Sequence, residues 1–500
     1  MLNNGWKAVP GRAETLSGTA PGTPPYLAPG TPPYLAPGTA PAPTGHAALR
    51  AAVEGPVLLP DDISYGAECR TFNLSRVLTP AVVVGAASTD DVAAALRHAG
   101  RLGMPVAVRN QGHQVVLPTA EDALLITTNR LQEISVDPGR RTVRVGAGVT
   151  WAQVLAETDK VRLAPVVGSA PNVGVVGYTL GGGLSPLLGR TLGYAADHVR
   201  WMEVVTADGT VREVTPERAP DLFWALLGGK GNFGVVTRME FDVFDIPRFY
   251  GGGLWFRGEE MRPVLEAWRA LVPALGEDTT TSFSVQRLPD VAALPRPLRG
   301  AFVLHVRLGH LGDGAQGARI AEPLRAAATP LLDTLAERPF GEIGEIHLDP
   351  VHAMPLVETG FALREFSAAT LDRLMELTGP GSGCPMKNVE VRALGGALDR
   401  EPARPNAVAS RGIPYTTFAV GSGSPAQLRA MTEFTRAYAR GLAPWRAPHH
   451  VINFLSPDEA LSEAEARDFY GAERYARLAT LKRVYDPANM FRFNHNIRPA

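Results

Sequence analysis

Residues 168–193 read GSAPNVGVVGYTLGGGLSPLLGRTLG, and this stretch decides the fold of the chain. It mixes glycines with small apolar residues and carries no acidic side chain. A glycine has no Cβ, so its backbone N–H can approach an anion closely. A concave run of such donors forms a cradle for phosphate. The stretch therefore predicts a bound nucleotide, and the rest of the sequence must indicate which one.

The composition is typical of a large globular protein. The 500 residues are 45% hydrophobic, which allows sizeable cores, and the length predicts roughly two to four domains. The net charge of −1 gives no electrostatic case for binding nucleic acid or an anionic membrane. The start of the chain has no apolar signal region, and no apolar run is long enough to cross a bilayer. We therefore expect a cytoplasmic protein whose partners are small molecules.

Disulfide and metal chemistry find no support in the sequence. Cys69 and Cys384 are far apart, so they neither form a disulfide scaffold nor make a CxxC motif. His449 and His450 are adjacent, so they cannot share one face of a helix or strand and lack metal-ligand spacing. No metal site is predicted.

Residues 1–45 form a separate region rich in proline and glycine. The octad PGTPPYLA occurs at 21–28 and again at 29–36, and then decays into PGTAPAPT. Repeated Pro-Gly pairs cannot sustain a helix or a sheet, so we expect a disordered or polyproline-like arm. Tyr26 and Tyr34 leave a docking role open, although a solvated tail is the simpler interpretation.

Residues 55–245 mix helical crossovers with hairpins. Apolar runs at 81–84 and 105–108 flank a segment with a serine N-cap and helical spacing, which predicts a β-α-β unit. Two hairpins follow at 134–145 and 202–214, with Asp-Pro-Gly and Asp-Gly at their turns. This layout predicts an α+β fold rather than a regular parallel sheet.

Residues 246–445 predict a second domain, in which helices cover a sheet. The expected strands are 280–286, 301–308, 389–394 and 415–420, and the expected helices are 261–271, 317–332, 367–377 and 425–441. Residues 446–500 form a C-terminal segment with one helix expected over 459–484. Within that helix Lys482 reads as a surface charge.

The string GKGNFGVV at 229–236 matches GxGxxG, which taken alone suggests a dinucleotide fold or a kinase lid. A Rossmann loop follows a strand and opens a helix, whereas here a helix precedes the glycines and a strand follows them. A kinase would also need HRD and DFG strings, and neither occurs. We interpret the segment as a turn beside a ligand that is bound elsewhere.

Four segments carry a resemblance to a known family. PVAVRNQGHQ at 105–114 is similar to its first pyrophosphate loop, and residues 168–199 are similar to its second loop. Residues 221–241 resemble its closing strand, and residues 470–499 resemble its terminal helix and flavin-facing tail. In this order they resemble the vanillyl-alcohol oxidase superfamily, and within it the berberine-bridge-enzyme-like branch. The resemblance implies a PCMH-type FAD-binding domain of two α+β subdomains, plus a substrate domain with an antiparallel sheet covered by helices.

The resemblance also implies which residues hold FAD. They are Arg109, Asn110, Gln111, Gly112, His113, Gln114, Gly168, Ala170, Pro171, Asn172, Gly174, Gly177, Gly181, Gly182, Gly183, Gly234, Val236 and Asn494. His113 stands where the family histidine bonds covalently to the 8α carbon of FAD, a step in which a neutral imidazole attacks an electrophilic flavin. Relatives with a second link carry cysteine at the position of Ala170, so we expect one link only. Without the resemblance, a tight turn at 109–112 and a C-terminal cap at Asn494 are the simpler interpretations.

The catalytic base is not identified by the sequence. Many relatives have a tyrosine in a YxNY pattern near the tail, but residues 451–454 read VINF, and Val115 replaces a tyrosine that often follows the histidine. The remaining candidates are Glu390, Arg392, Tyr415 and His450. Each also has a structural interpretation, as a strand charge pair, a core tyrosine or a loop histidine.

The function that follows from the resemblance is that of an FAD-dependent oxidase. It would pass two electrons from an alcohol, sugar, amine or natural-product intermediate to the flavin and then to O₂. One alternative is a dehydrogenase or cyclase of secondary metabolism that reacts poorly with O₂, which stopped-flow reoxidation would distinguish. Another is a non-catalytic flavin-binding protein, which only the missing tyrosines favour.

Overall fold

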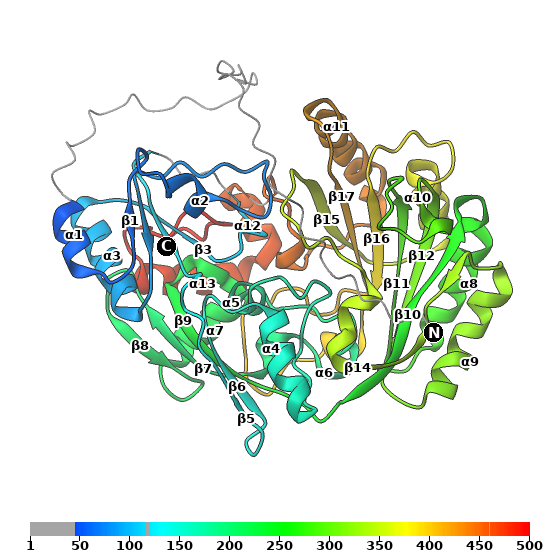
Figure 1. Ribbon diagram of the computed structural model, residues 1–500, viewed down its shortest axis with the longest axis horizontal. Coiled ribbons are helices and arrows are strands. Elements are labelled where there is room, and N and C mark those ends of the chain that lie inside the picture. The colour runs from blue at the N-terminus through cyan, green and yellow to red at the C-terminus, as the bar shows by residue number, and fades with distance from the viewer. Residues whose placement is uncertain (1–45, 117–120, 460) are drawn as a thin grey trace. The chain divides into compact units, whose positions relative to one another are not determined.

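The computed structural model describes residues 46–116, 121–459 and 461–500. The proline-rich repeats of residues 1–45, with the docking role considered for Tyr26 and Tyr34, lie outside these residues. The described strands form three sheets, and Figure 1 shows β1–β9 on one side of this region and β10–β17 on the other. The mixture of helices with parallel and antiparallel strands confirms the predicted α+β class.

The first sheet has four strands in the order β1-β2-β4-β3. Its strands are β1 (Val57–Leu58), β2 (Val82–Gly85), β3 (Val106–Arg109) and β4 (Leu124–Thr127), and its helices are α1 (His46–Ala52), α2 (Tyr65–Cys69) and α3 (Thr89–Leu102). The predicted β-α-β unit is present, because α3 joins β2 to β3 and both strands pair in parallel with β4. Since β3 is the edge strand, the chain can turn towards a ligand where it leaves Arg109.

The second sheet is antiparallel, in the order β5-β6-β9-β7-β8, and both predicted hairpins are present. Its strands are β5 (Ile134–Asp137), β6 (Thr142–Gly146), β7 (Val199–Val205), β8 (Val211–Val214) and β9 (Val235–Asp242). The helices of this part are α4 (Trp151–Thr158), α5 (Val175–Leu180), α6 (Gly189–Leu192) and α7 (Pro220–Gly229).

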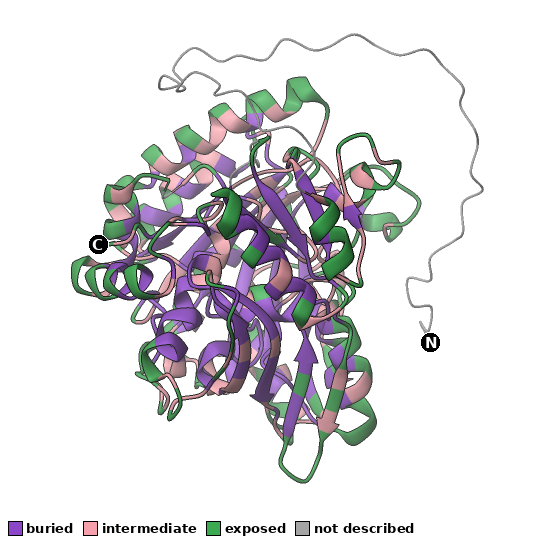
Figure 2. Ribbon diagram, turned by 90° about the vertical axis from the view of Figure 1, so that its left-hand side faces the viewer, coloured by how far each residue is buried: buried purple, intermediate pink, exposed green. Residues whose placement is uncertain are grey.

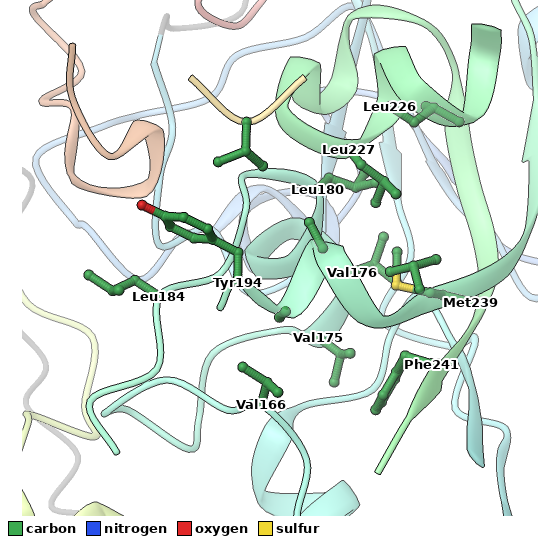
Figure 3. Close-up of a cluster of buried hydrophobic side chains, with 14 of the residues drawn as sticks. Val166, Val175, Val176, Leu180, Leu184, Tyr194, Leu226, Leu227, Met239 and Phe241 are labelled. Carbon is green, nitrogen blue, oxygen red and sulfur yellow. The ribbon is translucent and has the colours of Figure 1, made fainter. Parts of the chain in front are cut away.

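Helix α5 lies within the glycine-rich stretch and is held by its apolar side chains. Val175, Val176 and Leu180 are buried, and Figure 3 shows them among Met239 of β9 and Leu227 of α7. Burying one such side chain stabilises the fold by about 1.5–3 kcal/mol. The helix therefore gives the glycine-rich stretch a fixed backbone.

The third sheet has eight strands, in the order β13-β10-β12-β11-β16-β17-β15, with β14 also paired to β10. The strands are β10 (Arg248–Arg257), β11 (Thr279–Arg287), β12 (Phe302–His310), β13 (Leu332–Asp333), β14 (Ala336–Pro339), β15 (Val357–Leu363), β16 (Asn388–Ala393) and β17 (Tyr415–Gly421). Its helices are α8 (Met261–Leu271), α9 (Gly314–Ala327), α10 (Ala368–Thr378) and α11 (Pro425–Gly441). The pairings of the named strands are antiparallel, as predicted.

One face of this sheet packs under the helices and the other faces away from them. Side chains alternate along a strand, so Val389, Val391 and Ala393 of β16 join the helix-covered core while Asn388 and Arg392 point to the opposite face. Figure 2 shows strands that are largely buried and helices that expose their outer sides. The opposite face is thus free to form one wall of a cavity.

The prediction for residues 246–500 missed strands β10, β13, β14 and β15 and the break in the C-terminal helix. Strand β10 was not predicted, because its Gly251-Gly252-Gly253 triplet is unfavourable in strands; the glycines are needed, since a Cβ on Gly253 would lie 2.0 Å from Nε2 of His305. The single helix expected over 459–484 is divided into α12 (Glu463–Tyr470) and α13 (Ala472–Tyr485). The break occurs at Gly471, which has a φ of 77°.

The C-terminal segment returns to the first two sheets and is fastened there by a buried ion pair. Lys482 and Asp486 are 2.7 Å apart and both side chains are 0% exposed, so the prediction of a surface charge at Lys482 was wrong. Lys482 also donates to the carbonyls of Asn232 and Phe491, and Asp486 accepts from the amide of Phe491. These bonds fix the turn that leads into the final residues.

Candidate functional site

A cavity of about 530 Å³ lies between the loops of the first two sheets and the free face of the third sheet. We call residues 109–116 and 168–177 the loop wall, and the cavity-facing residues of β15, β16 and β17 the sheet wall. The segments 230–236, 452–454 and 491–495 close the remaining sides. The volume falls in the range of cofactor and ligand sites, about 300–1,000 Å³.

Most of the residues predicted to hold FAD line this cavity. They are Arg109, Asn110, Gln111, Gly112, His113, Gln114, Gly168, Ala170, Gly174, Gly177, Gly234, Val236 and Asn494. Pro171, Asn172, Gly181, Gly182 and Gly183 are not part of the lining. The three consecutive glycines instead form the turn after α5, where Gly182 and Gly183 have φ values of 95° and 76°.

The loop wall presents hydrogen-bond donors that have no partner. The backbone amides of residues 111–114 find no acceptor among the described residues, and Nδ2 of Asn110 is buried without one. The two loops touch closely, because a Cβ on Gly174 would lie 2.5 Å from that Nδ2 atom. A buried donor such as this Nδ2 atom is costly unless an acceptor satisfies it. The loop wall therefore fits an anionic group such as a pyrophosphate.

His113 stands in the loop wall with an unused ring nitrogen. Its ring stacks on Phe72 with centroids 3.9 Å apart, and its Nε2 is buried without a hydrogen-bond partner. Burial lowers the pKa of His113 to about 4, although a backbone hydrogen bond with Asn172 acts in the opposite direction. The imidazole is therefore neutral near pH 7, which is the form that can act as a nucleophile.

The sheet wall owes its polar side chains to strand register. Asn388 of β16 and Glu358 of β15 both pair with Val420 of β17, and Glu390 pairs with Phe418. Because partners across a sheet point to the same face, all of these side chains meet the cavity together with Arg392.

Glu390, one of the predicted base candidates, is held by two arginines. Its Oε2 lies 2.8 Å from Nη1 of Arg307, its Oε1 accepts from Nε of Arg392, and the residue is only 2% exposed. Burial alone would raise the pKa of Glu390, but Arg392 and Arg307 hold it below its ordinary value. A carboxylate in this state is a weak proton acceptor, so Glu390 and Arg392 line the cavity as an ion pair.

Glu358 is the carboxylate that the sequence did not reveal. It lines the cavity, and its carboxylate makes no hydrogen bond or ion pair with another described residue. Burial raises its pKa to about 7; Arg76 opposes the shift, and Glu459 and Asp458 add to it. The signal was hidden because the strand that carries Glu358, β15, was itself not predicted.

Lys230 is the second cavity residue that sequence reasoning missed. Its Nζ donates to Oε1 of Gln114, whose Nε2 donates in turn to the carbonyls of Ile452 and Leu455, at 2.9 and 3.0 Å. Burial lowers the pKa of Lys230 to about 7. The GxGxxG string thus does turn the chain beside the cavity, and it also delivers a lysine into it.

Two predicted catalytic candidates lie elsewhere. Tyr415 packs against the rings of Trp268 and Phe366, and His450 stacks on Phe469, so neither lines the cavity. Their structural interpretations are therefore the ones that the geometry supports. Among the described residues no group of three His, Cys, Asp or Glu side chains could hold a metal ion, and no described helix has the length and apolarity to cross a membrane.

Two family models match separate parts of the chain. The family model of an FAD binding domain matches residues 80–215, and a second model, berberine and berberine like, matches residues 452–498. These two domains and the relatives described below are consistent with the berberine-bridge-enzyme-like branch of the vanillyl-alcohol oxidase superfamily. The chain is an FAD-dependent oxidoreductase.

Two relatives match most of the chain's length. It is 27% identical over 464 residues to (R)-6-hydroxynicotine oxidase of Paenarthrobacter nicotinovorans, a match that covers 90% of this chain and 97% of that protein. It is 26% identical over 467 residues to an uncharacterized FAD-linked oxidoreductase, YgaK, of Bacillus subtilis, covering 90% and 98%.

Solved structures of similar fold cover the same range. The crystal structure of 6-hydroxy-D-nicotine oxidase from Arthrobacter nicotinovorans superposes with a TM-score of 0.79 at 24% identity, covering 90% of this chain and 98% of that one. The grass pollen allergen Phl p 4, which has glucose dehydrogenase activity, superposes with a TM-score of 0.78 at 17% identity, covering 91% and 99%. At these identities the likeness concerns the fold.

Proposed function

We propose that this chain is an oxidase that carries FAD on a single covalent link through His113, oxidises a small amine or alcohol, and uses O₂ as the electron acceptor. One observation carries the proposal. A single cavity joins free backbone donors and the unpartnered Nε2 of His113 on its loop wall to an unpaired carboxylate on its sheet wall.

The loop wall is the part that holds the cofactor. The free amides of residues 111–114 and Nδ2 of Asn110 bind the pyrophosphate, and Nε2 of His113 makes the covalent link. Ala170 has no nucleophilic atom, and Cys69 and Cys384 are buried outside the lining, so no second link forms. FAD, when bound, takes two electrons from the substrate and passes them to O₂.

Glu358 is the proton acceptor in this proposal. Oxidising an amine or alcohol requires a group that takes a proton from the substrate, and a base works best when its pKa lies near the operating pH. Glu358, with a pKa raised to about 7, meets this condition and has no competing ion pair. Glu390 does not meet this condition, because two arginines lower its pKa and hold it in its charged form.

Amines come first among the candidate substrates. A free carboxylate in a cavity attracts a cationic amine, and one relative that matches 90% of this chain is (R)-6-hydroxynicotine oxidase. The sheet wall also holds Asn388 and Phe418, which can hydrogen-bond and pack against a small heterocycle.

The proposal is tested with the purified protein and a panel of amines, alcohols and sugars that begins with (R)-6-hydroxynicotine. We expect a yellow protein whose flavin is bleached by at least one member of the panel and which then consumes O₂. Flavin that is reduced by substrate but reoxidised slowly by air would replace the oxidase with a dehydrogenase. A protein that binds no flavin would contradict the proposal as a whole.

A further inference from the structure

A second, smaller cavity lies on the same face of the third sheet as the larger one. Its volume is about 20 Å³, and three arginines line it, namely Arg190, Arg307 and Arg392, whereas no carboxylate of a described residue does. Of the described lining residues, Leu184 and Arg392 alone line both cavities. A cavity needs about 10–15 Å³ to hold one water. The smaller cavity therefore has room for a single small molecule or ion.

Strand register brings the polar side chains of this cavity together. Ser282 of β11 pairs with Arg307 of β12 on one side and with Arg392 of β16 on the other. Residues that lie opposite each other in a sheet point to the same face, so these three side chains are neighbours. His347 follows the turn η8 (Phe340–Ile346) and completes the polar part of the lining.

Several polar atoms in this lining are buried and have no partner. Nη2 of Arg307, Oγ of Ser282 and both ring nitrogens of His347 make no hydrogen bond. Arg307, Ser282 and His347 are only 1%, 4% and 3% exposed, so bulk water does not satisfy them. Buried polar groups of native proteins are almost always hydrogen-bonded. The cavity therefore fits a guest that accepts hydrogen bonds.

The charges around the cavity favour an anion over a water molecule. Glu390 is shared between Arg307, whose Nη1 lies 2.8 Å from its Oε2, and Arg392, whose Nε donates to its Oε1. Arg392 is also attracted by Asp349, whereas Arg307 has no second carboxylate among the described residues. Burial lowers the pKa of His347 well below its ordinary value, and the two arginines add to this, so the imidazole is neutral. A buried charge that is not fully paired is costly, and an anion in the cavity would remove this cost.

We propose that the smaller cavity binds one chloride ion, with Arg307, Ser282 and His347 as its hydrogen-bond donors. Hydrogen bonds from an arginine to an anion are about twice as strong as those between neutral groups. A carboxylate or phosphate group has several heavy atoms and does not fit the volume of about 20 Å³. The ion stabilises the sheet wall from behind Arg392. Its site involves neither FAD nor a substrate, so it stands apart from the proposed function.

Bromide shows the site directly, because it resembles chloride in size and charge and scatters X-rays anomalously. Crystals of the full chain in sodium bromide should give an anomalous peak between Ser282 and Arg307. In solution, chloride is raised from about 1 to about 200 mM, with gluconate keeping the ionic strength constant, and the midpoint of thermal unfolding should rise by about 1–3 °C.

Ser282→Val tests the assignment, because it removes the hydroxyl and fills part of the cavity. We expect it to abolish both the bromide peak and the effect of chloride on the midpoint. Ser284→Val is the matched control, since Ser284 is also buried on β11 but lines neither cavity, and it should keep both. Should Ser282→Val fail to fold, Ser282→Ala is measured instead and should lower the effect of chloride.

Three results would overturn the proposal. The first is a wild-type cavity that holds only water in the bromide crystals. The second is equal stabilisation of the wild type by chloride and gluconate, which together with a bromide peak would mean binding at crystal concentration only. The third is a chloride effect that Ser282→Val and Ser284→Val change to the same extent.

Discussion

The two walls of the cavity are built in different ways. The loop wall consists mainly of backbone and short side chains, and its function depends on donors that are left free. The sheet wall consists of long polar side chains that three strands bring together by register. A wall made of backbone tolerates few changes of shape, whereas a wall made of side chains can change its chemistry without changing the fold. We therefore place cofactor binding on the first and substrate chemistry on the second.

The sheet wall itself holds two carboxylates in opposite states. Glu390 is locked between Arg307 and Arg392, and its pKa is lowered, while Glu358 is unpaired and its pKa is raised to about 7. Removing the charge of Glu390 should therefore lower the stability of the fold. Removing the charge of Glu358 should instead lower the rate of the reaction.

The largest effect is expected for Glu358→Gln. Loss of a general base lowers the rate by about 10²–10⁴-fold. The carboxylate must be deprotonated to accept a proton, so wild-type activity should rise as the pH rises through about 7, and the variant should lack this limb. O₂ uptake across the pH range, with a substrate from the panel, measures both effects.

Stability gives the control for that variant. The folded pKa of Glu358 lies above the ordinary value of 4.5, so the folded protein loses stability as the pH rises from that value through about 7. Glutamine does not titrate, and Glu358→Gln should be at least as stable as the wild type above that range. A variant that is slow only because it unfolds would count against the role of Glu358.

Glu390→Gln should instead destabilise the protein, by about 3–5 kcal/mol, because it leaves Arg307, which is 1% exposed, without its partner. Denaturant unfolding measures the change. Glu277→Gln, which breaks an exposed pair with Arg400, is the control and should have a much smaller effect. Equal losses of unfolding free energy for the two variants would contradict the claim that the buried pair on the sheet wall stabilises the fold more than an exposed pair.

The difference between the walls also explains which residues of the cavity could be predicted from the sequence. Glycines and the following His113 are local signals, and the residues that they indicated, from Arg109 to Gln114, line the cavity. Glu358 could not be found, because its position depends on how β15 pairs with β17, a contact between residues about 60 positions apart. Lys230 was not predicted, because the GxGxxG string was interpreted from its glycines alone. Only the fold shows that its side chain lines the cavity.

Gly112→Ala should disturb the loop wall by an intermediate amount. Gly112 has a φ of 73°, and a Cβ there would lie 2.9 Å from Cα of Thr71. The left-handed conformation alone costs about 1–2 kcal/mol, and relief of the clash would move the free amides. We expect lower stability and weaker retention of FAD, measured by unfolding and by the flavin content after gel filtration.

Gly66→Ala is the matched control for that change. Gly66 lies in α2 and is exposed, and a Cβ added there would meet no other atom within 4 Å. Alanine in a helix is favoured over glycine by about 0.5–1 kcal/mol, so this variant should be slightly more stable and should keep its FAD. Loss of FAD in both variants would contradict the role of the loop wall.

The smallest expected effect is that of pH on the attachment of FAD. An ordinary histidine is half protonated near pH 6.5, but burial lowers the pKa of His113 to about 4. The neutral, nucleophilic form therefore predominates above that value, and the rate of attachment to apoprotein should stay level from about pH 8 to 6 if nothing else titrates. Fluorescence of the protein band on a denaturing gel follows the rate, and a steep fall near pH 6.5 would contradict the buried state of His113.

The most direct test of a covalent flavin on the loop wall is the mass of the peptide that contains His113, from denatured wild-type protein and from His113→Ala. We predict that the wild-type peptide carries one FAD and that the variant carries none covalently while still binding FAD in the folded state. A wild-type peptide of unmodified mass would contradict the link through His113.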